Sequence, residues 1–241
     1  MSADPMIRLD RLELTLPSQA GDVQILKGLD LEIGGGETVS VVGPSGSGKS
    51  SMMMIVGGLE RPTAGTVRVA GHSLGEMSED ALARFRRENV GIVFQDFHLV
   101  PTMTALENVA IPLEFAGRKD AFDRAAESLE KVGLGHRLSH YPGQLSGGEQ
   151  QRTALARAFA TGPKILLADE PTGNLDGETG RQVIDLLFEL CQTDGSTLML
   201  ITHDPALAER CDRRVQLIDG HITDDGRAQA TPSKAAARKA G

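Results

Sequence analysis

The sequence predicts an α/β protein whose core is interrupted by a mostly helical segment. Three short apolar runs, at residues 38–42, 164–168 and 197–202, are typical of strands that are buried on both faces. Amphipathic helical patterns lie between such runs along the chain. From about residue 97 to residue 161 the pattern turns mostly helical. Together these observations predict a core of buried strands and helices with a helical insertion.

The composition sets limits on the function. At 241 residues, the chain can bury a full core as one large domain, and its 40 % hydrophobic and 24 % charged residues are typical of a soluble globular protein. No apolar run approaches the roughly 20 residues that span a bilayer, and the first residues lack a signal-peptide core. We therefore expect a cytosolic chain, which at a membrane would need another chain as the spanning part. The net charge of −8 argues against a nucleic-acid partner.

The amino-terminal part is predicted to form strands that lead to a glycine-rich loop. Residues 7–16 and 23–33 alternate apolar and polar side chains, with a turn at residues 17–22. The glycines of residues 34–37 turn the chain into the buried run at 38–42. The next predicted elements are a helix over residues 49–59 that packs Met52, Met53 and Met54, a strand over 64–74, a helix over 78–89 capped by Ser78, and a strand over 90–96.

The carboxyl-terminal part is predicted from apolar faces at helical spacing. In the stretch 120–133 one face contains Phe122, Ala125, Ala126, Leu129 and Val132, and Gly133 ends the helix. A helix around residues 180–192 has a buried stripe of Val183, Ile184, Leu187, Phe188 and Cys191. Cys191 and Cys211 have no metal-binding spacing, so we expect reduced, partly buried thiols. The tail from Asp224 has little to bury and is expected to be disordered.

A phosphate-binding loop is predicted at residues 43–50. The sequence GPSGSGKS matches G-x-x-x-x-G-K-[ST], with an apolar strand before it and a helix after it. Small residues let backbone N–H groups point at phosphate oxygens, Lys49 places its charge on the β- and γ-phosphates, and Ser50 can ligate Mg²⁺. A glycine-rich turn that binds nothing would not need a buried strand before it and a helix after it. The loop therefore predicts a nucleoside triphosphate site. Its residues are Gly43, Pro44, Ser45, Gly46, Ser47, Gly48, Lys49, Ser50 and Ser51.

Polar side chains follow three further strands. Asp169 and Glu170 come after the run at 164–168, His203 follows the run at 197–202, and Gln95 closes the strand at 90–96. Ligands of open α/β sheets gather at the carboxyl ends of strands, so we expect these groups to meet the phosphate loop there. Asp169 would hold Mg²⁺, Glu170 would polarise the attacking water, His203 would reach the γ-phosphate, and Gln95 would orient water or complete the Mg²⁺ shell. Taken alone, each of these residues would be interpreted as a structural residue at the end of a strand.

A second anion site is predicted at the start of another helix. Ser146 can cap that helix, while Gly147 and Gly148 leave its first N–H groups open to an anion. A simple capped helix accounts for the serine but not for two glycines, which lower helix stability. This turn lies in the helical insertion, away from the strand ends. We therefore expect it to face the nucleotide of a second copy, in a head-to-tail dimer that buries two ATP molecules.

Taken in order, the motifs resemble the nucleotide-binding subunit of an ABC transporter. They are GPSGSGKS, Gln95, LSGGEQQR, ILLADE, Asn174 to Asp176, and His203. The resemblance implies a P-loop NTPase core, with a RecA-like mixed sheet and an amino-terminal antiparallel β-subdomain, plus a helical subdomain. It places one ATPase domain at residues 1–223, with core 1–95 and 162–223 and helical subdomain 96–161, followed by the tail at 224–241. It also implies the cofactors ATP and Mg²⁺ and a homodimer formed on ATP binding.

The same resemblance implies roles across the dimer. Ser146, Gly147, Gly148 and Glu149 would form the signature that faces the partner's γ-phosphate, and Asp176 would couple the two sites. Gln95 would link the chemistry to a membrane partner. The stretches 96–117, 169–176 and 202–222 look like the LolD/MacB/YbbA group, and within it most like the YbbA type. That group implies a peripheral subunit on the cytoplasmic side of the inner membrane.

The implied partner is an integral membrane permease with a large periplasmic domain. It would dock on the helical subdomain near Phe97–Leu106, where five apolar residues cluster: Phe97, Leu99, Val100, Met103 and Leu106. Any one of these residues could equally be an ordinary core residue. An alternative is an ABC ATPase of the FtsE type, which regulates a membrane complex without transport. The DNA-repair and chromosome-organising class needs a long coiled coil between Lys49 and Ser146, and the sequence has none.

One position departs from the family pattern. The family usually has an aromatic residue before the second strand, where it stacks on adenine. Here that position is Leu16, and the one tyrosine of the chain, Tyr141, lies beside the signature. An aliphatic contact by Leu16 or Val23 can bury a base but provides no aromatic stacking. We therefore expect weaker discrimination of ATP from GTP than the family norm.

Overall fold

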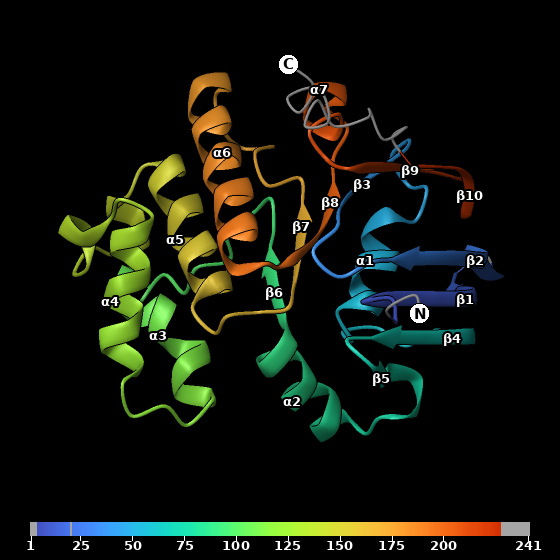
Figure 1. The fold of residues 1–241 in the computed structure, drawn as a ribbon, viewed down its shortest axis with the longest axis horizontal. Coiled ribbons are helices and arrows are strands. Elements are labelled where there is room, and N and C mark those ends of the chain that lie inside the picture. Colours follow the sequence, from blue (N-terminus) through green and yellow to red (C-terminus); the bar gives the residue numbers. More distant parts are fainter. Residues whose placement is uncertain (1–3, 20, 228–241) are drawn as a thin grey trace, which may run out of the picture.

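The computed structural model describes residues 4–19 and 21–227, which form two sheets with helices packed around them (Figure 1). The first sheet is antiparallel, in the order β2-β1-β4-β5. Its strands are β1 (Ile7–Ser18), β2 (Gly21–Ile33), β4 (Ala64–Val69) and β5 (His72–Ser73). Strands β1 and β2 form a long hairpin in which Ser18 pairs with Gly21. The turn predicted at residues 17–22 was too long, because the strand ends there are exposed and leave no apolar pattern in the sequence.

The second sheet carries the strands that lead to the predicted site. Its order is β10-β9-β3-β8-β7-β6, and the five strands from β9 to β6 run parallel to one another. These strands are β3 (Thr38–Val42), β6 (Val90–Val93), β7 (Ile165–Asp169), β8 (Thr197–Ile201), β9 (Arg213–Ile218) and the antiparallel β10 (His221–Arg227). Because β10 continues to Arg227, the tail predicted from Asp224 begins too early. The rest of that tail lies outside the described residues.

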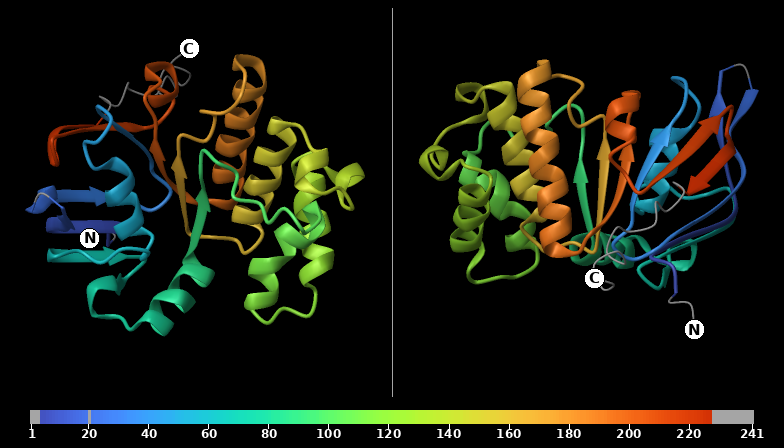
Figure 2. Two further views of the ribbon diagram at one scale, coloured as in Figure 1. Left: turned by 180° about the vertical axis from the view of Figure 1, so that it is seen from behind. Right: turned by 45° about the horizontal axis from the view of Figure 1, so that its top comes forward.

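Helices cover both faces of the parallel sheet. In Figures 1 and 2, α5 and α6 lie between the parallel strands and the pair α3 and α4, whereas α1 lies between the two sheets. The helices are α1 (Lys49–Val56), α2 (Glu79–Asn89), α3 (Ala105–Phe115), α4 (Ala121–Lys131), α5 (Gly147–Phe159), α6 (Gly177–Asp194) and α7 (Pro205–Ala208). Short 3-10 turns occur at Leu74–Glu76, Gly135–Arg137 and Pro142–Gln144. None of these helices has the length and hydropathy that a membrane span requires.

The apolar side chains form three clusters that follow this layering. One lies between the two sheets and includes Met52 and Met53, and the second joins α5 and α6 to the parallel sheet. The third packs α3 and α4 on the other side of α5, and gives the inserted helices a core of their own. In α4 the buried positions are Ala121, Ala125 and Leu129. Phe122, predicted to be in that face, is 46 % exposed, because the helix turns its smaller neighbour Ala121 inward.

Both cysteines are free and buried, as predicted for reduced thiols. Cys191 lies on α6 and Cys211 lies just before β9. Burial in apolar surroundings raises the pKa of each thiol to about 12. Both side chains therefore remain protonated at neutral pH and contribute to packing as small hydrophobic groups.

Candidate active site

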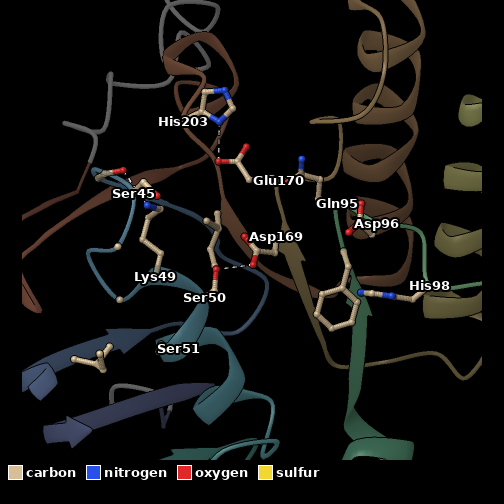
Figure 3. A pocket seen from close by; sticks show the side chains of 16 residues that line it. Ser45, Lys49, Ser50, Ser51, Gln95, Asp96, His98, Asp169, Glu170 and His203 are labelled. Carbon is tan, nitrogen blue, oxygen red and sulfur yellow. Dashed lines mark hydrogen bonds and ion pairs between the residues drawn. The ribbon is translucent and has the colours of Figure 1, made fainter. Parts of the chain in front are cut away.

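The carboxyl ends of β3, β6, β7 and β8 open into a cavity of about 660 Å³ (Figure 3). The phosphate loop follows β3 and Gln95 follows β6. Asp169 ends β7, Glu170 comes directly after it, and His203 follows β8. The cavity is lined by Ile25, Gly43, Ser45, Gly46, Gly48, Lys49, Ser50, Ser51, Phe94, Gln95, Asp96, His98, Asp169, Glu170, Ile201 and His203. The four strand-end groups predicted from the sequence therefore meet the phosphate loop around a single cavity.

The phosphate loop has a tight backbone that glycine permits. Gly43 has a φ of 154°, and a Cβ there would overlap the carbonyl of Leu217. Gly48 has a φ of 100° and caps α1 without a side-chain hydrogen bond. The amino group of Lys49 folds over the loop and donates to the carbonyls of Gly43 at 2.9 Å and Pro44 at 2.7 Å. The loop thus places a cation at the cavity beside the first turn of a helix, an arrangement suited to a polyphosphate.

Ser50 and Asp169 meet across the cavity floor. The Ser50 hydroxyl donates to Asp169 Oδ2 at 2.7 Å, and this bond joins the start of α1 to the end of β7. A hydroxyl and a carboxylate are oxygen ligands of the kind that Mg²⁺ prefers, and Mg²⁺ sites commonly use one or two protein ligands with substrate phosphates. No cluster of three or more acidic, histidine or cysteine side chains able to hold a metal occurs among the described residues. The pair therefore fits a Mg²⁺ shared with a bound phosphate.

Glu170 and His203 form a second pair at the rim of the cavity. Glu170 has a φ of 47°, an uncommon conformation for a residue with a side chain, and its carboxylate points to His203 (Figure 3). The His203 Nδ1 lies 2.8 Å from Glu170 Oε1. The Glu170 side chain is 20 % exposed, whereas that of His203 is 77 % exposed. The backbone strain is consistent with a functional position, because a relaxed strand end would not require it.

Gln95 is held on both sides by Asn174. Gln95 Nε2 donates to Asn174 Oδ1 at 3.2 Å, and Asn174 Nδ2 donates to the Gln95 carbonyl and to Asp96 Oδ1. These bonds join the segment after β6 to the loop between β7 and α6. Sequence reasoning noted Asn174 within a motif but gave it no role of its own. An exposed asparagine in a loop carries no pattern that distinguishes an anchor from a turn residue.

The turn from Ser146 to Gly148 lies outside this cavity. Ser146 caps α5, and its hydroxyl accepts from the Glu149 amide while the Glu149 carboxylate accepts from the Ser146 amide. The Glu149 carboxylate also accepts from Arg137 Nε at 2.9 Å. The hydrogen bond from the Ser146 amide, followed by smaller contributions from the Ser146 side chain and from Arg137, holds the pKa of Glu149 below its usual value. Arg137, which the sequence reasoning missed, therefore stabilises the capping box.

One of the two glycines has a reason within the chain itself. A Cβ on Gly148 would overlap Cγ2 of Thr179, in the first turn of α6. The simple capped helix that the sequence argument set aside is thus compatible with Gly148. Asp176 caps α6 and accepts from the amides of Glu178 and Thr179, and the Thr179 amide is the main reason that the Asp176 pKa is lowered. Thr179 therefore contacts two predicted functional positions. It bonds to Asp176, which was predicted to couple the two sites, and it lies against Gly148 of the signature turn.

Comparison with known proteins decides the family. Residues 26–173 match the family model described as ABC transporter. The chain belongs to the ABC transporter family. It is 50 % identical over 222 residues to the lipoprotein-releasing system ATP-binding protein LolD 2 of Caulobacter vibrioides, covering 91 % of this chain and 97 % of that protein. It is 46 % identical over 227 residues to the ABC transporter ATP-binding protein YbbA of Escherichia coli K12, covering 93 % of this chain and 100 % of YbbA.

Longer relatives and solved structures agree with this assignment. The macrolide export ATP-binding/permease protein MacB of Shigella flexneri is 44 % identical over 220 residues, covering 90 % of this chain and 34 % of MacB. A dimeric post-hydrolysis structure of the cassette MJ0796 with ADP and Pi superposes with a TM-score of 0.86 at 41 % identity, covering 92 % of this chain and 98 % of that one. The predicted fold class and the LolD/MacB/YbbA group are confirmed. This ABC transporter chain is an ATP-binding subunit and an ATPase.

Proposed function

We propose that two copies of this chain close on two ATP molecules with Mg²⁺ and drive a membrane-spanning permease by hydrolysing them. The observation that carries the proposal is the separation of two anion sites. The phosphate loop and the strand-end groups line one cavity, whereas the turn at Ser146–Gly148 lies outside it. A head-to-tail pair brings each turn to the cavity of the other copy. The MJ0796 cassette, which is dimeric in its solved structures, supports this arrangement.

Within each cavity different side chains have different roles in phosphoryl transfer. The loop amides and Lys49 bind the phosphates. Ser50, Asp169 and Gln95 would hold Mg²⁺, which would neutralise phosphate charge. Glu170 polarises the attacking water. The 2.8 Å contact with His203 orients the Glu170 carboxylate, and His203, being exposed, also reaches toward the γ-phosphate edge. Most of the catalytic effect comes from positioning and charge, because the reaction needs little covalent assistance from the protein.

The membrane partner docks beside the segment that follows Gln95. Phe97, Leu99, Met103 and Leu106 are half-buried, while Val100 is 36 % exposed. Asn108 fixes this segment by accepting from the Val100 amide and donating to the Val100 and Met103 carbonyls. The segment therefore offers apolar surface on a firmly held backbone. The relatives LolD and MacB, by their names, serve lipoprotein release and macrolide export, which supports a permease partner and a peripheral place at the inner membrane.

Replacing Glu170 with Gln tests the catalytic assignment. The variant should bind nucleotide normally, lose turnover and accumulate an ATP-bound dimer on size-exclusion chromatography, because the amide cannot accept a proton from water. Glu189→Gln, an equivalent change on an exposed position of α6, serves as the control and should leave turnover intact. Normal hydrolysis by Glu170→Gln would refute the role of Glu170.

The same trapped variant identifies the partner. Tagged Glu170→Gln protein, extracted with membranes in mild detergent and Mg-ATP, should retain a stoichiometric integral membrane protein. A large external domain on that protein supports a permease of the LolD/MacB type. Recovery with division proteins alone would instead favour the regulatory, FtsE-type function.

A further inference from the structure

One buried side chain on α5 is bonded to both loops that carry the groups assigned to catalysis. Gln151 is fully buried, and its Nε2 donates to the Phe94 carbonyl at 3.3 Å and to the Pro171 carbonyl at 2.6 Å. Phe94 directly precedes Gln95, and Pro171 directly follows Glu170. Both N–H groups of a single amide therefore fix the backbone beside two residues that are 75 positions apart in the sequence.

The amide of Gln151 is not explained by packing alone. Its carbonyl oxygen, Oε1, is buried and has no hydrogen-bond partner among the described residues. An unpaired buried acceptor is unfavourable, and an apolar side chain of similar length would fill the same space without it. A glutamine at this position is favourable only if the two hydrogen bonds that it donates to the loops contribute more than the unpaired oxygen costs. This points to the loops, rather than to the helix core, as the purpose of the side chain.

A second side chain of the same helix strengthens the connection. Arg157 donates from Nη1 to the His98 carbonyl at 2.6 Å and from Nη2 to the Phe97 carbonyl at 3.0 Å. Burial lowers the pKa of this guanidinium. Together Gln151 and Arg157 bond four backbone carbonyls, three in the segment after β6 and one after β7. Helix α5 thus holds both loops from one rigid element.

The place of Gln151 on the helix gives this connection a function. It lies four residues after Gly147, about 6 Å along the helix axis, and so within one turn or so of the signature. We propose that Gln151 is a positioning residue that ties Gln95 and Glu170 to the signature turn of the same chain. When that turn engages the nucleotide of the second copy, the displacement of α5 reaches the catalytic groups of its own cavity. The inference rests on the proposed dimer, which it extends by a route from one site to the other.

Two substitutions at Gln151 test the inference. Gln151→Met keeps the length of the side chain and removes both donors, so kcat should fall by about tenfold or more, as misplaced catalytic groups imply. The KM for ATP and nucleotide binding by the monomer should change by less than about twofold, because neither donor contacts the phosphate loop. Gln182→Met, the same change at an exposed position of α6, is the matched control. Gln182 lies outside the cavity and the signature, so the kcat of this variant should remain close to that of the unmodified chain.

Gln151→Glu supplies a readout that a purely structural role would not affect. A protonated carboxyl returns one donor to the loops, whereas a carboxylate would face two carbonyls and repel both. The kcat of this variant relative to the unmodified chain should therefore decline as pH rises, while the same ratio for Gln151→Met should stay constant. A pH-independent ratio for Gln151→Glu would contradict the positioning role.

Dimer formation separates this inference from the proposed function. In a Glu170→Gln background, Gln151→Met should still form the ATP-trapped dimer at nearly the same ATP concentration, although its melting temperature should fall because the Pro171 carbonyl loses its donor. If kcat and dimer formation fell together, Gln151 would act on the fold as a whole and the inference would fail. A Gln151→Met variant as active as Gln182→Met would also overturn it. Failure of Glu170→Gln itself to dimerise would instead refute the proposed function.

Discussion

Substituting alanine for Gly148 should destabilise the chain through a single methyl contact with α6. The new Cβ would overlap Cγ2 of Thr179, whereas Cβ of Thr179 lies at 3.8 Å, an ordinary contact distance. The Thr179 hydroxyl bonds to Asp176, so turning the methyl away to a second rotamer would break that hydrogen bond. Overpacking of this kind costs about 1–3 kcal/mol, and the gain in helix propensity over glycine offsets up to about 1 kcal/mol. The net expected loss is therefore between about 0 and about 3 kcal/mol.

Removal of the opposing methyl should reverse the sign of that effect. Thr179→Ser deletes Cγ2 but retains the hydroxyl that bonds to Asp176, so in this background Gly148→Ala should be neutral or stabilise by up to about 1 kcal/mol. The coupling between the two changes should be about 1–3 kcal/mol, measured by urea unfolding of the four proteins of the cycle. Thr179→Val, which keeps a methyl, should give no relief. If Gly148→Ala cost the same with Ser as with Thr at position 179, the packing explanation of Gly148 would be wrong.

Three further predictions concern the signature and the base. Arg137→Met should raise the ATP concentration that traps the Glu170→Gln dimer by roughly fivefold, since one partly exposed charge-assisted bond of about 1 kcal/mol is removed, with monomer binding unchanged in a nucleotide titration. The lowered pKa of Glu149 means that its carboxylate stabilises the fold fully above pH 4.5, the ordinary value, and less as pH falls through the lowered one. The stability deficit of Glu149→Gln, from urea midpoints, should therefore be constant from pH 5 to 8 and shrink below about pH 4.5; a deficit that grew in acid would contradict this sign. Leu16 is 38 % exposed and pairs with Val23 in the β1–β2 hairpin, so this surface is aliphatic and provides no aromatic stacking for a base. GTP should therefore compete with ATP comparably for binding, and Leu16→Tyr should favour ATP. A strong ATP preference in the unmodified chain would refute the prediction.

Contiguous patterns made most of the fold and the cavity predictable from the sequence. The phosphate loop is one unbroken motif, and Asp169, Glu170 and His203 each follow an apolar strand, so the rule for strand ends places them together. Ser78 was recognised as an N-cap because capping depends on a few adjacent residues, and its hydroxyl does accept from the Ala81 amide. These features share a local cause, in that neighbours in sequence determine the geometry.

The features that sequence reasoning missed depend on contacts between distant segments. Gln151, Asn174 and Arg137 act on backbone or carboxylate groups brought to them by the fold, and nothing in their own neighbourhood marks them. Phe122 illustrates a different limit, because two adjacent apolar residues can each fit a helical face, and only the packing of α3 on α4 decides which one is buried. The end of β10 was missed because its last residues are polar. They pair with β9 through the backbone and through the ion pair of Asp225 with Arg213, a contact that the local sequence does not show.

The two buried cysteines have a practical consequence for chemistry on this chain. With two cysteines in the whole sequence, both enclosed and both with a thiol pKa near 12, alkylating reagents at neutral pH find almost no reactive thiolate. A cysteine introduced on the surface can then be labelled or crosslinked selectively without first removing the native pair. Placed at Ser45 of one copy and near Ser146 of another, such cysteines would turn the head-to-tail arrangement into a covalent bond that a non-reducing gel can detect.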